Sequence, residues 1–381
     1  MNVYEATLKR ISTCFRDFDS VLVSFSGGKD SGVLLNLCYQ YANENGLLDK
    51  LAFYHLDYEA QYDLTTQYVT ETFKRLYNVK RFWLCLPVSA NCGCRLDSDT
   101  WIPWLVTDKK LWCRSIPKLP HVIHENNCPF KIEIGKKDYS VQDDFCRWYA
   151  SQYGKTAVMI GIRTDESLDR YELIHVKGWI VGGKNNVYKV YPLYDWKTSD
   201  IWIANGRFEY PYNKLYDLYY KSGLSIENMR VANPFHSCGM ANLKLYRVIE
   251  PKTWNKLINR VNGVNFACIY GGTQAMGAKG LVKPNHFTWE EYAKFLIETS
   301  PAKDQYSERI KTYISKWKLQ GYLNGIPDEA DLMMERKRDV PSWRKVCACI
   351  LKNDFTCKSL GFTQSKPPSY HLIKKINLGL I

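Results

Sequence analysis

The chain has 381 residues, of which 45% are hydrophobic and 24% are charged, and its formal net charge is +13. This composition is typical of a globular protein and excludes a disordered chain. No apolar run approaches the ~18–20 residues of a membrane span, and the first 20 residues lack the apolar core of a signal peptide. We therefore expect a cytoplasmic protein with no membrane association.

The thirteen cysteines are an odd number spread over a long chain, unlike the dense disulfide framework of a small secreted domain. Reduced thiols are expected, with a metal or redox site as the alternative. The positive charge lies downstream of the first segment, because residues 1–80 have a balance of −2 and residues 331–381 a balance of +6. This charge suits the binding of a polyanionic substrate or a nucleic acid. The alternative is that the positive surface only keeps the protein in solution.

Strands and helices alternate in the first part of the chain. Apolar spacing predicts a helix over residues 4–18. Short, β-rich apolar runs then predict strands, and helical patterns lie between them; the strands are expected at 21–25, 51–56 and 79–86, and the helices at 32–42 and 60–77. This alternation indicates an α/β fold with a doubly wound, mainly parallel sheet.

The alternation stops at residues 87–135, a stretch rich in Pro, Cys, Trp and Asp that reads as an insertion. It resumes with a helix at 145–153, a strand at 157–162, a hairpin around 182–186 and a helix from 199 or 200. Beyond residue 205 the pattern is mostly helical. We therefore predict an α/β domain over residues 1–205, which carries the insertion, and a basic helical region over residues 206–381.

One turn carries the strongest chemical signal, and it reads Ser26-Gly27-Gly28-Lys29-Asp30-Ser31. It joins a buried strand to a helix. Paired glycines let the backbone turn tightly, and the free N–H groups of a helix start favour an anion. The serine hydroxyls and the Lys29 ammonium add donors for phosphate, and Asp30 is placed to hold the loop or approach Mg²⁺. The motif lacks the spacer of a Walker A loop. A strand–helix turn without a ligand is the alternative.

The segment Ser24-Phe25-Ser26-Gly27-Gly28-Lys29-Asp30-Ser31 resembles the PP-loop of adenine nucleotide α-hydrolase-like proteins, which include N-type ATP pyrophosphatases and sulfonucleotide (PAPS) reductases. Residues 161–170 and 191–202 are similar to two further segments of the PAPS reductase branch, and the three occur in the expected order. Residues 212–217 and 341–344 resemble a PAPS reductase-like family of mostly uncharacterised proteins. Some members are described as sulfurtransferase-like, or as co-regulators encoded beside a ParB-like partner.

The resemblance implies ATP or a related adenine nucleotide as ligand, with Mg²⁺. The implied nucleotide-binding residues are Ser24, Ser26, Gly27, Gly28, Lys29, Asp30, Ser31, His55, Asp57, Gly161, Arg163, Glu166 and Arg170, and the implied catalytic residues are Lys29, Asp30 and Arg163. Asp57 at a strand end would meet the ribose, the adenine or Mg²⁺, or would be only a cap or loop residue. Arg163 and Arg170 would clamp an anion with Glu166 orienting them, or would form a surface network.

The implied reaction is adenylylation of an unknown second substrate for sulfur or nitrogen transfer. The chain departs from true sulfonucleotide reductases, which carry a late Glu-Cys-Gly-x-His motif that this sequence lacks. Cys238 is the weak candidate for a redox thiol, and a buried, inert thiol is its alternative. Two other hypotheses therefore stay open: a phosphoadenylylsulfate reductase, and a nucleotide-sensing regulator acting with a ParB-like or nucleic-acid partner.

Two cysteine groups have the ligand types of a Zn²⁺ site. Cys92, Cys94, Cys113 and Cys128 are candidate ligands in the insertion, near His121 and His124, although their spacing is irregular and plain thiols are the alternative. Cys347, Cys349 and Cys357 form a looser group.

The basic C-terminal part interleaves Lys and Arg with aromatic residues such as Trp343, which suits nucleic-acid binding. Charged helix faces over core aromatics give the same pattern.

Overall fold

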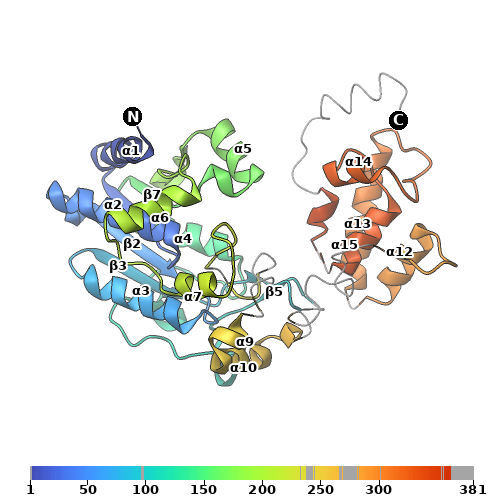
Figure 1. The fold of residues 1–381 in the computed structure, drawn as a ribbon, viewed down its shortest axis with the longest axis horizontal. Coiled ribbons are helices and arrows are strands. Elements are labelled where there is room, and N and C mark those ends of the chain that lie inside the picture. Colours follow the sequence, from blue (N-terminus) through green and yellow to red (C-terminus); the bar gives the residue numbers. More distant parts are fainter. Residues whose placement is uncertain are drawn as a thin grey trace. The chain divides into compact units, whose positions relative to one another are not determined.

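The computed structural model of the protein describes residues 2–95, 98–231, 233–236, 243, 245–265, 268, 281, 283–300, 302–352, 354 and 356–361. The chain divides into two compact units (Figure 1). The first consists of Met1–Ala90, Ile102–Pro234 and Leu245–Arg260, and the second of Asn91–Trp101, Phe235–Lys244 and Val261–Ile381.

The first unit is built on a seven-stranded sheet with the order β6-β3-β2-β1-β7-β9-β8. Its strands are β1 (Ser20–Ser24), β2 (Leu51–Leu56), β3 (Lys80–Cys85), β6 (Val122–His124), β7 (Thr156–Ile160), β8 (Ile180–Gly182) and β9 (Val187–Val190). All neighbouring strands are parallel except β8, which pairs antiparallel with β9. The predicted doubly wound, mainly parallel α/β fold is confirmed.

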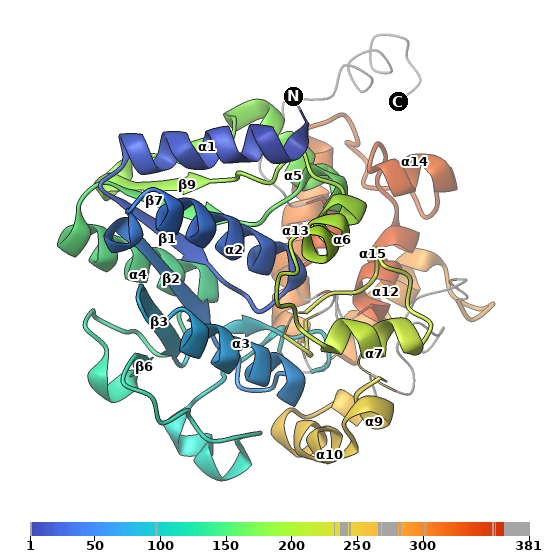
Figure 2. The same ribbon diagram turned by 60° about the vertical axis from the view of Figure 1, so that its left-hand side comes forward.

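Alternate side chains of β1 serve two hydrophobic cores, as expected for a strand buried on both faces. Val21 and Val23 point into one core, and Leu22 points into the other. Helices lie on both faces of the sheet (Figure 2). The first core packs against α1 (Val3–Asp17), α2 (Lys29–Glu44), α3 (Asp63–Arg75) and α6 (Thr198–Arg207), and the second against α4 (Asp138–Tyr153).

Trp196 and Asp200 hold the segment before α6 in place. Trp196 is 2% exposed, and its indole Nε1 donates to the Thr7 hydroxyl of α1 at 2.8 Å. Asp200 accepts the Lys197 N–H at 2.7 Å and so caps the start of α6. Both residues therefore have structural roles.

The remaining helices of the first unit are α5 (Leu168–Lys177), α7 (Leu215–Lys221), α9 (Tyr246–Ile249) and α10 (Pro251–Arg260). Because α7, α9 and α10 group with the sheet, a boundary at residue 205 does not coincide with the division between the two units. The expected insertion at 87–135 contributes β6 to the edge of the sheet beside β3. It also carries β4 (Ala90–Asn91) and β5 (Thr100–Trp101), which form a two-stranded sheet.

The second unit is helical where it is described, which confirms the helical C-terminal region. Its main helices are α12 (Trp289–Glu298), α13 (Lys303–Lys318), α14 (Leu332–Lys337) and α15 (Trp343–Leu351). They enclose a separate core that includes Trp289, Tyr306 and Val346. In neither unit does a described helix combine the length and the apolar character that a bilayer crossing requires.

Candidate functional site

The predicted phosphate loop lies at the carboxyl end of β1, where it turns into α2. Gly27 has a φ of +77°, a conformation that favours glycine, and a Cβ there would lie 3.0 Å from Val69. Gly28 is the N-cap of α2, so Lys29 and Asp30 form its first turn. The backbone thus turns sharply and presents the start of a helix at the sheet edge, which is the geometry that binds anions.

Hydrogen bonds hold the loop in this shape. The Ser26 and Ser31 hydroxyls lie 2.9 Å apart, and Ser31 Oγ accepts the Ser26 N–H at 3.1 Å. Asn213, which precedes α7, donates from Nδ2 to the Gly27 carbonyl at 3.1 Å. The Tyr216 hydroxyl accepts the Lys29 N–H at 3.0 Å. Neither Asn213 nor Tyr216 was a predicted site residue, although both fall in the segment 212–217 that carries the family resemblance.

Three N–H groups of the loop are left for a ligand. Those of Gly27, Asp30 and Ser31 make no hydrogen bond within the described part of the chain. They belong to a positive-φ glycine and to the first turn of α2, where partial positive charge gathers. The loop therefore offers a cluster of free donors to an anion.

Gly161 lies directly against this loop, at the end of β7. A Cβ on Gly161 would come within 3.1 Å of the backbone carbon of Asp30 and of the Ser31 nitrogen. A Cβ contact of this length is tighter than nine in ten real ones, so a larger residue at this position would push the backbone of the loop away. The sequence placed Gly161 among the nucleotide-binding residues, and the structure places it behind the loop.

Arg163 is 1% exposed and joins the loop to the segment after β7. Its Nε donates to Asp30 Oδ1 at 2.6 Å, and its terminal nitrogens bind Asp165 at 2.6 Å and Glu166 at 3.3 Å. The other Asp30 oxygen accepts from the Lys29 ammonium at 3.1 Å. In this arrangement Arg163 acts on the loop through Asp30, because its guanidinium is engaged by carboxylates.

Arg170 is half-buried at the edge of the same network and pairs with Glu166. Burial and the nearby charge of Arg230 hold the pKa of Arg170 below its ordinary value, although the Asp30 carboxylate opposes them. The structure thus brings Arg230 close to Arg170 beside the loop. Arg230 was not a predicted site residue.

His55 and Asp57 lie at the end of β2, and both side chains are fully buried. His55 Nδ1 lies 2.8 Å from the Phe25 carbonyl, and burial lowers the pKa of His55. Asp57 accepts the Trp83 indole N–H at 2.7 Å and pairs with Arg114 of the insertion. Burial is the largest influence and opposes its ionisation, but the nearby Arg114 and His55 and the hydrogen bonds that Asp57 accepts together outweigh burial and leave the pKa of Asp57 lowered. Both side chains thus face protein groups in this structure.

The four candidate zinc ligands are divided between the two units. Cys92 and Cys94 belong to the second unit, whereas Cys113 and Cys128 belong to the first. Among the described residues no group of three or more His, Cys, Asp or Glu side chains is arranged to hold a metal ion. The cysteines of the looser group, Cys347, Cys349 and Cys357, are buried in the core of the second unit. Cys238, the candidate redox thiol, lies outside the described residues.

In the basic C-terminal part, Arg344 forms ion pairs with carboxylates of the same unit. Arg344 pairs with Glu329 at 2.8 Å and with Glu335 at 3.1 Å. Burial, followed by the nearby Arg338, lowers the pKa of Lys345 to about 8. Trp343 belongs to the core of the second unit. These contacts fit a charged helix surface over core aromatics, the second of the two interpretations that the sequence left open.

Two family models match the chain. A phosphoadenosine phosphosulfate reductase domain matches residues 20–92 and 109–223, and a domain of unknown function (DUF3440) matches residues 223–324 and 322–370. The uncharacterized protein YbdN of Escherichia coli (strain K12) is 32% identical over 387 residues, which cover 97% of this chain and 93% of YbdN. The chain therefore belongs to the PAPS reductase-like family of PP-loop proteins, together with YbdN.

Solved structures show weaker likeness. The FMN adenylyltransferase of Candida glabrata is 18% identical, with 56% of this chain and 57% of that one covered and a TM-score of 0.35. The phosphoadenylyl-sulfate reductase of Candida auris is 14% identical, with coverages of 60% and 87% and a TM-score of 0.34. The U34-tRNA thiolase NcsA of Methanococcus maripaludis is 12% identical, with coverages of 75% and 85% and a TM-score of 0.33.

Proposed function

We propose that the chain is an enzyme that binds ATP with its phosphates on the Ser26–Ser31 loop. The observation that carries this proposal is the set of three free N–H groups, on Gly27, Asp30 and Ser31, at the start of a helix. An anion there gains hydrogen bonds that the protein leaves unmade, and it also gains the favourable end of the helix dipole. The Lys29 ammonium adds a formal charge beside the donors.

The reaction that fits this site is the transfer of AMP to a substrate oxygen. The oxygen attacks the α-phosphorus, a new P–O bond forms, and the bond to the pyrophosphate leaving group breaks. A sulfur or nitrogen nucleophile then displaces AMP from the adenylylated substrate. Donors fixed before the reaction stabilise the negative charge that develops on the phosphates. We propose Lys29 as a catalytic residue for this reason, and Arg163 as the positioning residue that orients Asp30.

A resident Mg²⁺ does not fit the donors of the loop in this structure. The two oxygens of Asp30 accept from Arg163 and Lys29, and the described residues contain no metal-holding group of three side chains. Mg²⁺ usually binds through one or two carboxylates together with substrate phosphates. We propose that Mg²⁺ arrives as part of the substrate Mg-ATP and is held by the phosphates of the nucleotide.

The test is to follow the products formed from ATP in the presence of a small-molecule cell extract that supplies the acceptor. The proposal predicts AMP and pyrophosphate, and it predicts their loss in Lys29→Ala and Asp30→Ala. Lys9→Ala is the matched control, because Lys9 is an exposed lysine on α1. Circular dichroism checks that each variant is folded. Release of ADP and phosphate, or unchanged turnover in both loop variants, would overturn the proposed reaction.

A further inference from the structure

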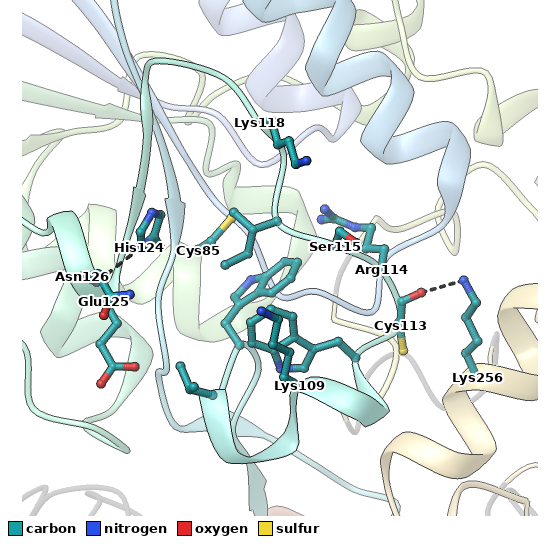
Figure 3. Close-up of a pocket in the computed structure, with 14 residues that line it drawn as sticks. Cys85, Lys109, Cys113, Arg114, Ser115, Lys118, His124, Glu125, Asn126 and Lys256 are labelled. Atoms are coloured by element: carbon teal, nitrogen blue, oxygen red, sulfur yellow. Dashed lines mark hydrogen bonds between the residues drawn. The ribbon is translucent and has the colours of Figure 1, made fainter.

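A cavity of about 610 Å³ lies at the same edge of the sheet as the phosphate loop. Its lining includes Cys85 at the end of β3 and His124 at the end of β6 (Figure 3). Because β1, β2, β3 and β6 are neighbouring parallel strands, their carboxyl ends meet at one edge. Ligands of open α/β sheets bind along this edge. Most of the lining comes from residues 104–118 of the insertion, with further side chains from 124–126 and α10.

Buried ion pairs fix the wall of this cavity. Glu59 is fully buried, and its carboxylate accepts the N–H groups of Trp104 at 2.9 Å and of Cys113 at 3.0 Å. Arg260 pairs with the same carboxylate at 2.7 Å. Asp57 in turn holds Arg114. The irregular insertion is therefore anchored to the sheet domain at Trp104, at Cys113 and at Arg114. These contacts hold the wall of the cavity in place without a ligand.

The lining carries an excess of positive charge. Its cations are Lys109, Arg114, Lys118 and Lys256, and Glu125 is its one carboxylate. Asp57 neutralises Arg114, and Lys256 donates from Nζ to the Cys113 carbonyl at 2.8 Å. Within the described part of the chain, no carboxylate lies within ion-pair distance of the three lysine ammonium groups. A concave site with uncompensated cations favours an anion.

Indole rings give the cavity an apolar wall. Trp104 is 2% exposed and meets Trp112 edge to face at 5.3 Å between centroids. Their Nε1 atoms donate to the carbonyls of Asp57 and Leu105, so both indole N–H groups are already satisfied. Trp112, which is partly buried, therefore offers most of the contact area, and the buried Trp104 packs behind it. This wall fits the apolar or aromatic body of an organic ligand.

Two lining residues contain buried polar atoms without a hydrogen-bond partner in the described structure. They are Nε of Arg114, a donor, and Oε2 of Glu125, an acceptor. Buried polar groups are nearly always satisfied in folded proteins. Because neither atom is open to solvent, a ligand reaches them only if the wall shifts, and the lysines remain the groups that an anion meets first.

We propose that this cavity binds a small organic anion, with a phosphate or sulfate group on the lysines and an apolar body against Trp104 and Trp112. Its position on the same sheet edge as the phosphate loop makes it the second-substrate site of the enzyme. This role rests on the proposed function, whereas the binding of the anion does not. The lysines Lys109, Lys118 and Lys256 then determine the charge of the substrate that the enzyme accepts.

The test uses 4-nitrophenyl phosphate and 4-nitrophenyl sulfate as probes in calorimetric titrations, with 4-nitrobenzyl alcohol, which carries no charge at neutral pH, as the reference. The protein is titrated both as wild type and as Lys29→Ala, so that uptake at the phosphate loop is recognised. We expect one of the charged probes, or both, to bind to both proteins, and the double variant Lys109→Glu/Lys118→Glu to weaken this binding at least tenfold. Equally tight binding of 4-nitrobenzyl alcohol would overturn the assignment to an anion.

The matched control is Lys9→Glu/Lys74→Glu, which makes the same change of charge at exposed lysines on α1 and α3. It should bind the probe like the wild type. Absence of uptake, or equal affinity in the Lys109→Glu/Lys118→Glu protein, would overturn the proposed site. The titration of ATP into the wild type is a separate measurement: its failure would remove the proposed function and leave the anion site standing.

Discussion

Nε of Arg163 lies 2.6 Å from Oδ1 of Asp30, and this contact joins the loop after β7 to the first turn of α2. The two residues are 133 positions apart in the sequence. Arg163 is buried, and its other nitrogens bind Asp165 and Glu166. The pair therefore sets the position of the Asp30 carboxylate beside the donors that we assign to phosphate.

Loss of Arg163 should damage both stability and nucleotide binding. Arg163→Ala leaves the Asp30 carboxylate without its strongest partner, and breaking a buried ion pair in this way costs about 3–5 kcal/mol of the free energy of unfolding. The freed carboxylate also repels the ATP phosphates. Urea unfolding and ATP titration measure the two effects. Adding Asp30→Asn should recover part of the stability, and a double variant no more stable than Arg163→Ala would contradict the pairing.

Substitution of Gly161 should disturb the phosphate loop without touching a charge. The Cβ of Gly161→Ala would press on the backbone of Asp30 and Ser31 at 3.1 Å and displace the start of α2. We expect ATP affinity to fall at least tenfold. The control is Gly206→Ala in α6, where a Cβ meets no atom within 4 Å and alanine favours the helix. Equal ATP affinity in the two variants would show that Gly161 does not shape the loop.

Removal of the Tyr216 hydroxyl should tighten ATP binding. This hydroxyl accepts the Lys29 N–H at 3.0 Å and so competes with a phosphate oxygen for the same donor. A hydrogen bond contributes about 0.5–1.5 kcal/mol, so Tyr216→Phe should raise the affinity roughly 2- to 10-fold. Tyr212→Phe is the control, because that hydroxyl bonds to Asp217 and not to the loop. Weaker binding by Tyr216→Phe would mean that the hydroxyl itself holds the nucleotide.

His121 should make the fold sensitive to mild acid. It stacks on Phe73 at 4.8 Å, and burial, followed by the charge of Arg81, lowers its pKa to about 4. The unfolded chain protonates this imidazole near pH 6.5, so between pH 6.5 and 4 the unfolded state binds more protons. The free energy of unfolding should therefore fall as the pH falls through this window and level off below it.

His121→Gln tests this pH dependence, because glutamine does not titrate. Urea unfolding at pH 7, 6, 5 and 4 should give a shallower loss of stability than in the wild type. Some slope remains, because burial also lowers the pKa of His55. An identical slope in the two proteins would exclude His121 as a source of the acid sensitivity.

Regular elements could be predicted from local patterns. The strand expected at 51–56 is β2, and the hairpin expected around residues 182–186 joins β8 and β9. The helix after the loop begins at Lys29 rather than Gly32, with Gly28 as its N-cap. The three-residue strand β6 was not predicted, since a run this short has no periodicity to distinguish it from a loop.

The site could be predicted only in part. The loop 26–31 was visible because glycines and a charged turn after a buried strand are local features. The contacts of Asp57 and Arg163 were not, because the partners Arg114 and Asp30 are 57 and 133 positions away. Long-range ion pairs of this kind depend on the sheet order and on an irregular insertion, and neither leaves a periodic signal in the sequence.

Calorimetric titration of Mg-ATP tests the central claim most directly. The account predicts binding of one ATP per chain by the wild-type protein and loss of that binding in Lys29→Ala, while the exposed-lysine control Lys9→Ala binds as the wild type does. Absence of ATP uptake by the folded wild-type protein, or equal affinity in the wild type and Lys29→Ala, would contradict the assignment of the Ser26–Ser31 loop to the phosphates of a nucleotide.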